Sequence, residues 1–204
     1  MGVTIFAGLY GDVYDSYVSK WLKAVKAAKP DRIIIGSDRD RTIDGVDVVV
    51  GTCTGTHPSA FFQNLAAGKA RTEWVWQMQI DDLIHKDALT GLDEVTADVW
   101  QVGYDRTDGA RYIPPALSAG ELLAAPDNPF VMASPVRRKA FAAVGGYPDI
   151  AYEDWGLWRL MARAGYTFAA AGKTAFAYNW HPETSRTSQD ARHRETNMSE
   201  ALAL

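Results

Sequence analysis

The sequence has one cysteine, Cys53, so no disulfide can form within the chain and a cysteine-rich zinc site is excluded. Histidine is also scarce. Its four copies, His57, His85, His181 and His193, show no close pair at the spacing of metal ligands. Together these shortages argue against a zinc enzyme.

Long hydrophobic runs are missing as well. No apolar stretch approaches the roughly 18 residues that suggest a membrane span, and the start, MGVTIFAG, lacks the basic flank of a signal peptide. Phe6 stands where an N-myristoylation motif requires serine or threonine. We therefore expect a cytoplasmic protein with no membrane partner.

The chain has no excess of positive charge. A net charge of -4 and a pI near 5.5 argue against broad, nonspecific binding of nucleic acid. A local basic cluster near the C-terminus, formed by Arg186, Arg192, His193 and Arg194, needs a separate explanation. With 204 residues and 47% hydrophobic content, the chain is expected to form one globular domain over residues 1–204.

Apolar strands alternate with amphipathic helices in the first half of the sequence. Strands are predicted at Val3–Leu9, Arg32–Gly36, Val46–Gly51 and Glu73–Ile80, and helices at Tyr14–Val25 and from Pro58 to about Lys69. This alternation is typical of an α/β domain with a mostly parallel central sheet flanked by helices.

The second half is less regular. Strands are predicted at Val99–Tyr104, Phe130–Ser134, Thr167–Ala170 and Ala175–Trp180, and helices at Arg137–Val144 and Asp154–Ala164. Ser118 and Glu121 have the spacing of a capping box at the start of a short helix. The polar tail after Arg186 is expected to be a last helix or partly disordered.

Two adjacent aspartates, Asp81 and Asp82, directly follow a predicted buried strand. In open α/β sheets ligands bind beyond the carboxyl ends of the strands, and paired carboxylates there suit Mg²⁺ or Mn²⁺ with a diphosphate substrate. The alternative is that one of them only caps a helix beginning near Leu83.

A second acidic pair, Glu153 and Asp154, begins a predicted helix. The helix dipole and its free amide groups stabilise a carboxylate at this position. Capping alone would explain one acid. If Asp154 points into a cleft, it can instead accept a proton from an acceptor hydroxyl as a general base.

Several segments, in this order, resemble the nucleotide-sugar-dependent glycosyltransferases of the GT-A fold, nearest to the family 2 type. They are FAGLYGD, Asn64 in the helix before the third strand, QIDDLIHKDAL, GGYPDIAYEDWGLWRLMARAG and NWHPETSRTS. The resemblance runs from about Val3 to Ser188. It implies one Rossmann-like domain, with a nucleotide-sugar-binding half at about 1–103 and an acceptor-binding and catalytic half at about 104–204.

The resemblance also implies a donor and metal site. Asp81 would match the metal-binding aspartate of the DxD motif, with Asp82 beside it, and His181 would complete the metal shell. Arg186 would lie near the diphosphate, which would explain part of the basic cluster. Gln79 stands where the family commonly has a further aspartate, so its amide could bind ribose but would add no charge to the metal site.

Further roles follow from the same resemblance. Asp38, after the second strand, would lie near the uridine or other base, and Asn64 would border the donor site or serve the structure. Asp154 would be the catalytic base, and Glu153 would orient the acceptor or its loop. The implied enzyme is a hexosyltransferase that depends on Mn²⁺ or Mg²⁺ and inverts the configuration of a sugar from a nucleotide diphosphate sugar, most simply a UDP-sugar.

Two other functions stay open. A catalytically silent relative that binds a nucleotide or sugar would tolerate Gln79. A nucleotidyltransferase would also use carboxylates and Mg²⁺, but it usually has a basic, glycine-rich phosphate loop, and LYGDVYDS is acidic. The acceptor could be a glycan, a protein side chain, a small molecule or a hydroxylated base in DNA, as in compact virus-encoded enzymes of this type.

Overall fold

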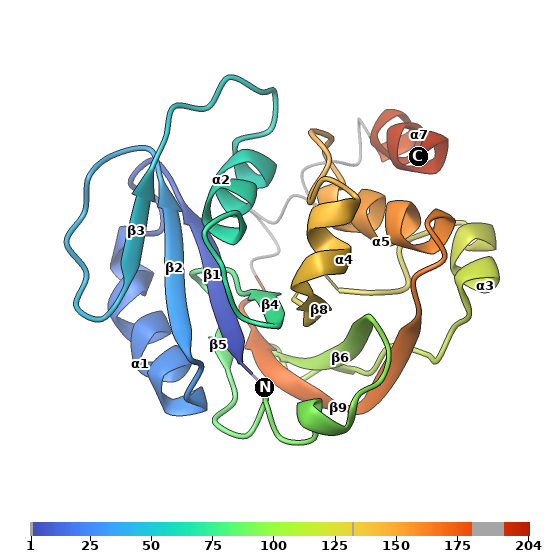
Figure 1. Cartoon of the computed structure of the whole chain (residues 1–204), viewed down its shortest axis with the longest axis horizontal. Coiled ribbons are helices and arrows are strands. Elements are labelled where there is room, and N and C mark those ends of the chain that lie inside the picture. Colours follow the sequence, from blue (N-terminus) through green and yellow to red (C-terminus); the bar gives the residue numbers. More distant parts are fainter. Residues whose placement is uncertain (1, 132, 181–193) are drawn as a thin grey trace.

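The computed structural model describes residues 2–131, 133–180 and 194–204, which form one mixed α/β domain around a curled sheet (Figure 1). Parallel strands alternate with helices in its first half, which contains β1 (Val3–Leu9), η1 (Asp15–Tyr17), α1 (Val18–Ala28), β2 (Arg32–Ser37), β3 (Asp47–Val50), α2 (Pro58–Ala67) and β4 (Trp74–Gln77). All seven residues of β1 are buried, as expected for a central parallel strand that is covered on both faces.

Within the described residues, the second half adds five strands, one 3₁₀ helix and four α-helices. They are β5 (Leu83–Ile84), η2 (Leu92–Glu94), β6 (Val99–Arg106), β7 (Arg111–Tyr112), α3 (Ala119–Ala124), β8 (Val136–Arg137), α4 (Arg138–Ala143), α5 (Glu153–Arg163), β9 (Phe168–Tyr178) and α7 (Arg194–Ala203). The strand order is β3-β2-β1-β4-β8-β6-β9-β5, and β7 pairs with β6. Pairings among β1 to β4 are parallel, whereas β8 runs antiparallel to β4 and β6. The expected α/β domain with helices flanking a central sheet is therefore confirmed.

Two hydrophobic cores lie on opposite sides of the sheet. One contains Trp21 and Val25 of α1, and the other contains Phe141 of α4 and Trp158 of α5. Gly36 of β2 allows α2 to pack closely, because a Cβ there would lie 2.0 Å from the carbonyl oxygen of Phe62. These cores hold helices against the two faces of the sheet.

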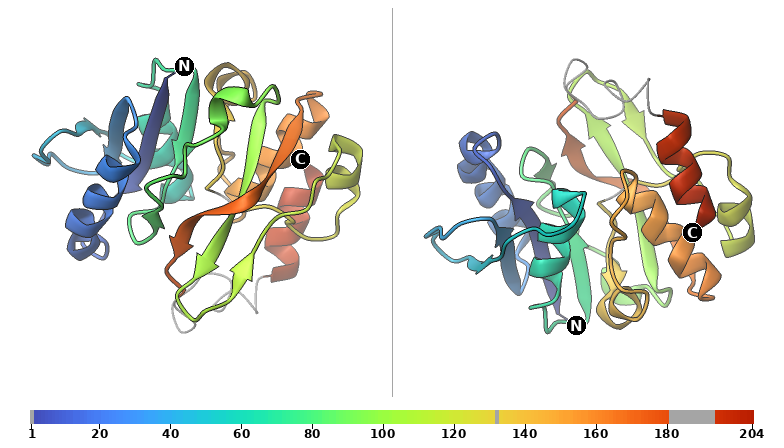
Figure 2. Two further views of the ribbon diagram at one scale, coloured as in Figure 1. Left: turned by 90° about the horizontal axis from the view of Figure 1, so that it is seen from below. Right: turned by 90° about the horizontal axis from the view of Figure 1, so that it is seen from above.

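The C-terminal helix α7 packs along α5, as both views in Figure 2 show. Arg159 of α5 is only 4% exposed and donates from Nη1 to the carbonyl oxygen of Leu123 and from Nη2 to that of Leu202. Both carbonyls lie in the last turn of a helix, α3 or α7, where a cation is favoured by the dipole. One arginine thus ties three helices together. Within the described residues, no helix has the length and apolar character needed to cross a membrane.

Two local predictions were wrong, and one alternative is excluded. The described residues of Phe130–Ser134 form no strand, and the strand β8 begins only after Pro135, which has no N–H to donate to a ladder. The two strands predicted at 167–170 and 175–180 are one strand, β9, whose pairing with β6 is irregular around Gly172 (φ +65°). No helix begins near Leu83, because Leu83 and Ile84 pair with Ala177 and Phe176 of β9 as strand β5.

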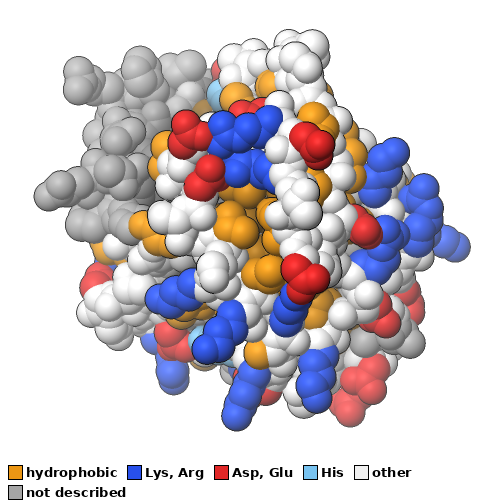
Figure 3. All heavy atoms as spheres, turned by 90° about the vertical axis from the view of Figure 1, so that its left-hand side faces the viewer, with side chains coloured by type: hydrophobic (Ala, Val, Ile, Leu, Met, Phe, Trp, Pro, Cys, Tyr) orange, Lys and Arg blue, Asp and Glu red, His pale blue; other side chains and the backbone are white. Residues whose placement is uncertain are grey.

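On the face that carries β3 and α1, acidic and basic side chains interleave around a hollow with hydrophobic side chains at its base (Figure 3). Ion pairs join Lys26 to Asp44 and Arg32 to Asp47 in this region. Because both signs of charge alternate there, this face does not present the single-sign field that nucleic-acid backbones require.

Candidate functional site

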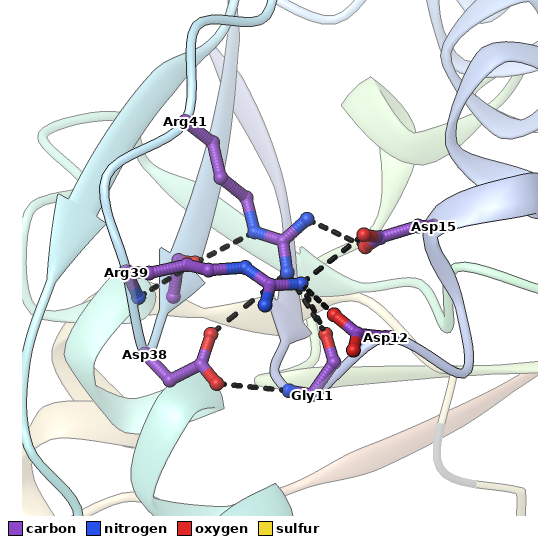
Figure 4. Close-up of polar contacts among 7 residues, drawn as sticks. Gly11, Asp12, Asp15, Asp38, Arg39 and Arg41 are labelled. Atoms are coloured by element: carbon purple, nitrogen blue, oxygen red, sulfur yellow. Dashed lines mark hydrogen bonds and ion pairs between the residues drawn. The ribbon is translucent and has the colours of Figure 1, made fainter.

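The segment after β1 and the segment after β2 are joined by a charged cluster at the carboxyl edge of the sheet (Figure 4). Asp38 accepts a hydrogen bond from the backbone N–H of Gly11 (2.9 Å), and the guanidinium groups of Arg39 and Arg41 both donate to the carbonyl oxygen of Gly11 (2.8 and 2.9 Å). Asp15 pairs with both arginines. Asp38 therefore lies at the edge where a nucleotide base is expected, held in place by the loop after β1.

Asp12 adds a third carboxylate to this cluster. It pairs with Arg39 and raises the pKa of that guanidinium. The side chain of Arg41 is only 13% exposed, whereas that of Asp12 is 83% exposed. Arg41 thus lies on the buried side of the cluster, and Asp12 lies on its solvent-exposed side.

Asp81 and Asp82 follow β4 at the same carboxyl edge, and their two side chains have different surroundings. Asp82 is 3% exposed and accepts a hydrogen bond from the backbone N–H of Asn179 (2.9 Å). Burial, followed by repulsion from Asp81, raises the pKa of Asp82 well above its usual value. Because no helix follows, the helix-capping alternative for this pair is ruled out.

Asp81 is half-buried and borders a small pocket of about 100 Å³. The pocket is also lined by Lys20 of α1, by Thr107 after β6 and by Asn179 after β9. Segments far apart in the sequence therefore meet around Asp81. Gln79, two residues earlier, is half-buried as well.

A divalent cation fits this arrangement through one carboxylate. Within the described ranges, no three His, Cys, Asp or Glu side chains gather closely enough to hold a metal ion by themselves. Mg²⁺ commonly binds through one or two carboxylates together with substrate phosphates and water, and Asp81 offers such a carboxylate at the pocket. The donor set therefore suits a cation that arrives with a diphosphate rather than a closed protein site.

Asp154 is the second residue of α5, in the first turn of the helix, and is partly buried. Burial, with a further contribution from the neighbouring Glu153, raises the pKa of Asp154 to about 7. Backbone N–H groups of the first turn and the side chain of Asn128 act in the opposite direction. Glu153 is only 2% exposed. A carboxyl group with a pKa near neutrality can exchange a proton at physiological pH, which suits acid–base chemistry.

The loop before α5 is fastened to α2, so the start of α5 lies on the side that faces α2 (Figure 1). Asp149 accepts hydrogen bonds from the backbone N–H groups of Thr56 (2.9 Å) and His57 (2.7 Å), just before α2. Asn64 of α2 donates to the carbonyl oxygen of Tyr147 (2.8 Å) and accepts from its N–H (2.9 Å). These bonds connect the loop before the acidic pair to α2, in the first half of the chain.

Asn64 therefore has a structural role in this fold. Gly146, with φ +76°, precedes Tyr147, and a Cβ on it would lie 2.3 Å from Oδ1 of Asn64. Glycine is needed there both for the positive φ and for the close approach. The position thus serves the turn before α5.

Replacing Asn64 by leucine is expected to lower the free energy of unfolding by about 2 to 4 kcal/mol, because it leaves the N–H and the carbonyl oxygen of Tyr147 unpaired. Urea unfolding of both proteins measures this difference. An unchanged stability together with weakened donor binding would instead support the role of Asn64 as a ligand.

Sequence reasoning missed several residues around the site. Asn128, in the connection between α3 and β8, contacts Asp154, and Asp149 anchors the loop before α5. The only local signal for Asn128 was the series of prolines around it; its partner lies 26 residues further along the chain. His181 and Arg186, predicted for the metal and the diphosphate, lie outside the described residues, as does the basic cluster up to His193.

Comparison with known proteins gives a match of fold. No model of a known protein family matches the sequence, and no curated protein matches it. Among solved structures, Staphylococcus aureus TarS 1–349 has a TM-score of 0.65 at 15% identity, covering 88% of this chain and 60% of that one. The same fragment has been solved in complex with UDP-GlcNAc, with a TM-score of 0.60 at 15% identity, covering 89% of this chain and 59% of that one.

A second structure of similar fold is the mannosyltransferase PcManGT from Pyrobaculum calidifontis, solved in complex with GDP-Man and Mn²⁺. Its TM-score is 0.68 at 14% identity, and the match covers 99% of this chain and 64% of that one. The chain thus spans less than two thirds of the length of these structures. These matches confirm the GT-A-like glycosyltransferase fold expected from the sequence.

Proposed function

We propose that this chain is a metal-dependent, inverting glycosyltransferase that moves a sugar from a nucleotide diphosphate sugar, most simply a UDP-sugar, to an acceptor hydroxyl. The observation that carries the proposal is Asp154, a carboxyl group in the first turn of α5 whose pKa is raised to about 7. The fold match adds support, because nucleotide sugars are bound in the TarS and PcManGT complexes. We assign donor binding to about residues 1–103, and acceptor binding and catalysis to about 104–204.

In the proposed reaction, Asp154 accepts the proton of the acceptor hydroxyl as its oxygen attacks the anomeric carbon. The bond from that carbon to the acceptor oxygen forms while the bond to the diphosphate oxygen breaks on the opposite face, so the configuration inverts. Glu153 stays buried beside Asp154, and its charge helps to keep the pKa of Asp154 high enough for this base to work near neutral pH.

On the leaving-group side, Asp38 would contact the base, Gln79 the ribose, and Asp81 would hold Mg²⁺ or Mn²⁺, with Asp82 behind it. When bound, the cation supplies positive charge that offsets the charge developing on the diphosphate. His181 and Arg186 remain predictions for the metal shell and the diphosphate. The acceptor is proposed only as a class, a hydroxyl compound.

The proposal is tested by incubating the purified chain with a panel of UDP-, GDP- and TDP-sugars, with Mn²⁺, Mg²⁺ or EDTA, and measuring released nucleoside diphosphate. We expect metal-dependent release of nucleoside diphosphate from one of the donors, because water can slowly take the place of the acceptor. If no donor reacts, calorimetry of nucleotide binding follows. Binding without turnover, even with candidate acceptors present, would favour the silent relative, and no binding would contradict the proposal.

A further inference from the structure

We propose that Asn128 is a positioning residue for the proposed base, since its side-chain amide holds one carboxylate oxygen of Asp154 in place. The inference rests on the proposed function of Asp154. Nδ2 of Asn128 donates to Oδ2 of Asp154 over 2.9 Å, between residues 26 positions apart in the sequence. A hydrogen bond to a charged group of this kind fixes the rotation of the carboxyl group more firmly than a bond between neutral groups.

The orientation of the Asn128 amide is determined by a second contact. Its Oδ1 accepts a hydrogen bond from the backbone N–H of Phe130 (3.1 Å). That N–H can be satisfied only by an acceptor, so the carbonyl end of the amide must face Phe130 and the NH₂ end must face Asp154. A flipped amide would lose both bonds. Asn128 therefore presents a donor to Asp154 in this loop.

The segment that carries Asn128 is anchored directly after this residue by contacts with β7 and β9. The hydroxyl of Tyr112 on β7 donates to the carbonyl oxygen of Pro129 (2.6 Å). Phe130 is 4% exposed and stacks on Phe168 of β9, with ring centroids 5.8 Å apart. Pro129 itself has a fixed φ. An irregular segment is thus held rigidly by the sheet, and the position of Asn128 is set by contacts outside α5.

The other charged and titratable groups around Asp154 do not replace this bond. The charge of Glu153 repels that of Asp154. The pKa of the buried Tyr147 phenol is raised by burial and, in addition, by the charges of Asp154 and Glu153. Arg159, on the same helix, is directed to the carbonyls of Leu123 and Leu202. On the helices packed against α5, two acids have described side chains: Glu121 of α3 closes the capping box with Ser118, and Glu200 of α7 is exposed.

The pKa of Asp154 is set by two opposing effects. Burial and Glu153 raise the pKa of Asp154, and the bond from Asn128 opposes that rise by stabilising the anion. Without Asn128, Asp154 would hold its proton at higher pH, and its carboxyl group would lose this side-chain hydrogen bond and keep only the backbone N–H groups of the first turn of α5 as partners. Both changes reduce the fraction of molecules with a correctly placed base at neutral pH.

The test uses Asn128→Ala and Asn128→Asp, with Asp127→Asn as a neighbouring control that keeps an acceptor for the Asn128 N–H. The pH dependence of donor turnover and the titration of the Asp154 carboxyl carbon by NMR are measured in each. For Asn128→Ala we expect the midpoint of both pH titrations to rise by about 1 pH unit. We expect kcat at pH 7 to fall about 10-fold, with KM little changed. Asn128→Asp keeps the acceptor for Phe130 and adds a like charge, so its midpoint should rise further.

Unchanged midpoints in a folded Asn128→Ala or Asn128→Asp would overturn the inference, as would an equal shift in Asp127→Asn. If Asn128→Ala does not fold, Asn128→Asp, which has the same shape, decides the question. The two proposals fail separately. Absence of donor turnover in the unmodified chain would reject the proposed function, while the NMR titration would still show whether Asn128 controls the carboxyl group of Asp154.

Discussion

Replacing Asp154 by asparagine is expected to reduce sugar transfer by about 10²- to 10⁴-fold, because the proposed general base is lost. The amide keeps an oxygen that can accept from Asn128, so the local structure should persist. Initial rates of nucleoside diphosphate release at saturating donor measure the loss. A variant with the activity of the unmodified chain would show that Asp154 only caps α5.

The same substitution should stabilise the folded chain at high pH. The pKa of Asp154 is raised in the folded state from 3.8 to about 7, so ionisation costs stability that is absent below about pH 4, grows between pH 4 and 7, and is complete above pH 7. Asp154→Asn removes this cost. The gain is at most about 4 kcal/mol above pH 7 and close to zero near pH 4. Thermal unfolding at both pH values measures the difference.

Glu153→Gln provides a matched control for Asp154→Asn, because it removes the like charge beside Asp154 and leaves the proposed base in place. The midpoint of the pH–rate curve should then move below that of the unmodified chain. A midpoint that stays the same would contradict the assignment of the titrating group to Asp154.

Replacing Asp81 by asparagine is expected to abolish metal-dependent donor turnover, with a loss of at least about 100-fold, because a neutral amide is a poor ligand for a hard cation. Binding of the nucleoside in the absence of metal should be little affected, since Asp81 is not proposed to contact the nucleotide base. Calorimetry of UDP binding with Mn²⁺ and with EDTA separates the two effects.

Asp87→Asn is the control for Asp81→Asn, because Asp87 is an exposed acid six positions later, after β5, and uses its backbone carbonyl to bind Lys173. It should retain full activity. If Asp81→Asn kept its metal dependence, the ligand would have to be sought among other acids of the carboxyl edge, and the proposed role of Asp81 would be wrong.

Much of the fold could be predicted because local patterns determine it. The apolar runs at Val3–Leu9 and at the second strand gave β1 and β2 within one residue, and both hydrogen bonds of the Ser118–Glu121 capping box are present. The helix that begins at Glu153 was also found to within one residue. In each case the burial pattern or the cap is encoded within a few neighbouring positions.

The misses depend on contacts far apart in the sequence. β5 exists because Leu83 and Ile84 pair with residues of β9 that lie more than 90 positions later, so the residues after Asp82 could not by themselves exclude the alternative of a helix there. The bond between Asn128 and Asp154 is likewise invisible to local patterns. The sequence thus named Asp81 and Asp154 as candidates, whose roles stay predictions, but it could not name Asn128, which contacts Asp154.

The most direct test of the proposed role of Asp154 is the initial rate of nucleoside diphosphate release by the unmodified chain, measured from pH 5 to pH 9 with its best donor and metal. A base that must be deprotonated and has a pKa of about 7 predicts a rate that rises with pH and reaches half its plateau near pH 7. A rate that stays flat through this range, or falls, would contradict the role of Asp154 as the base.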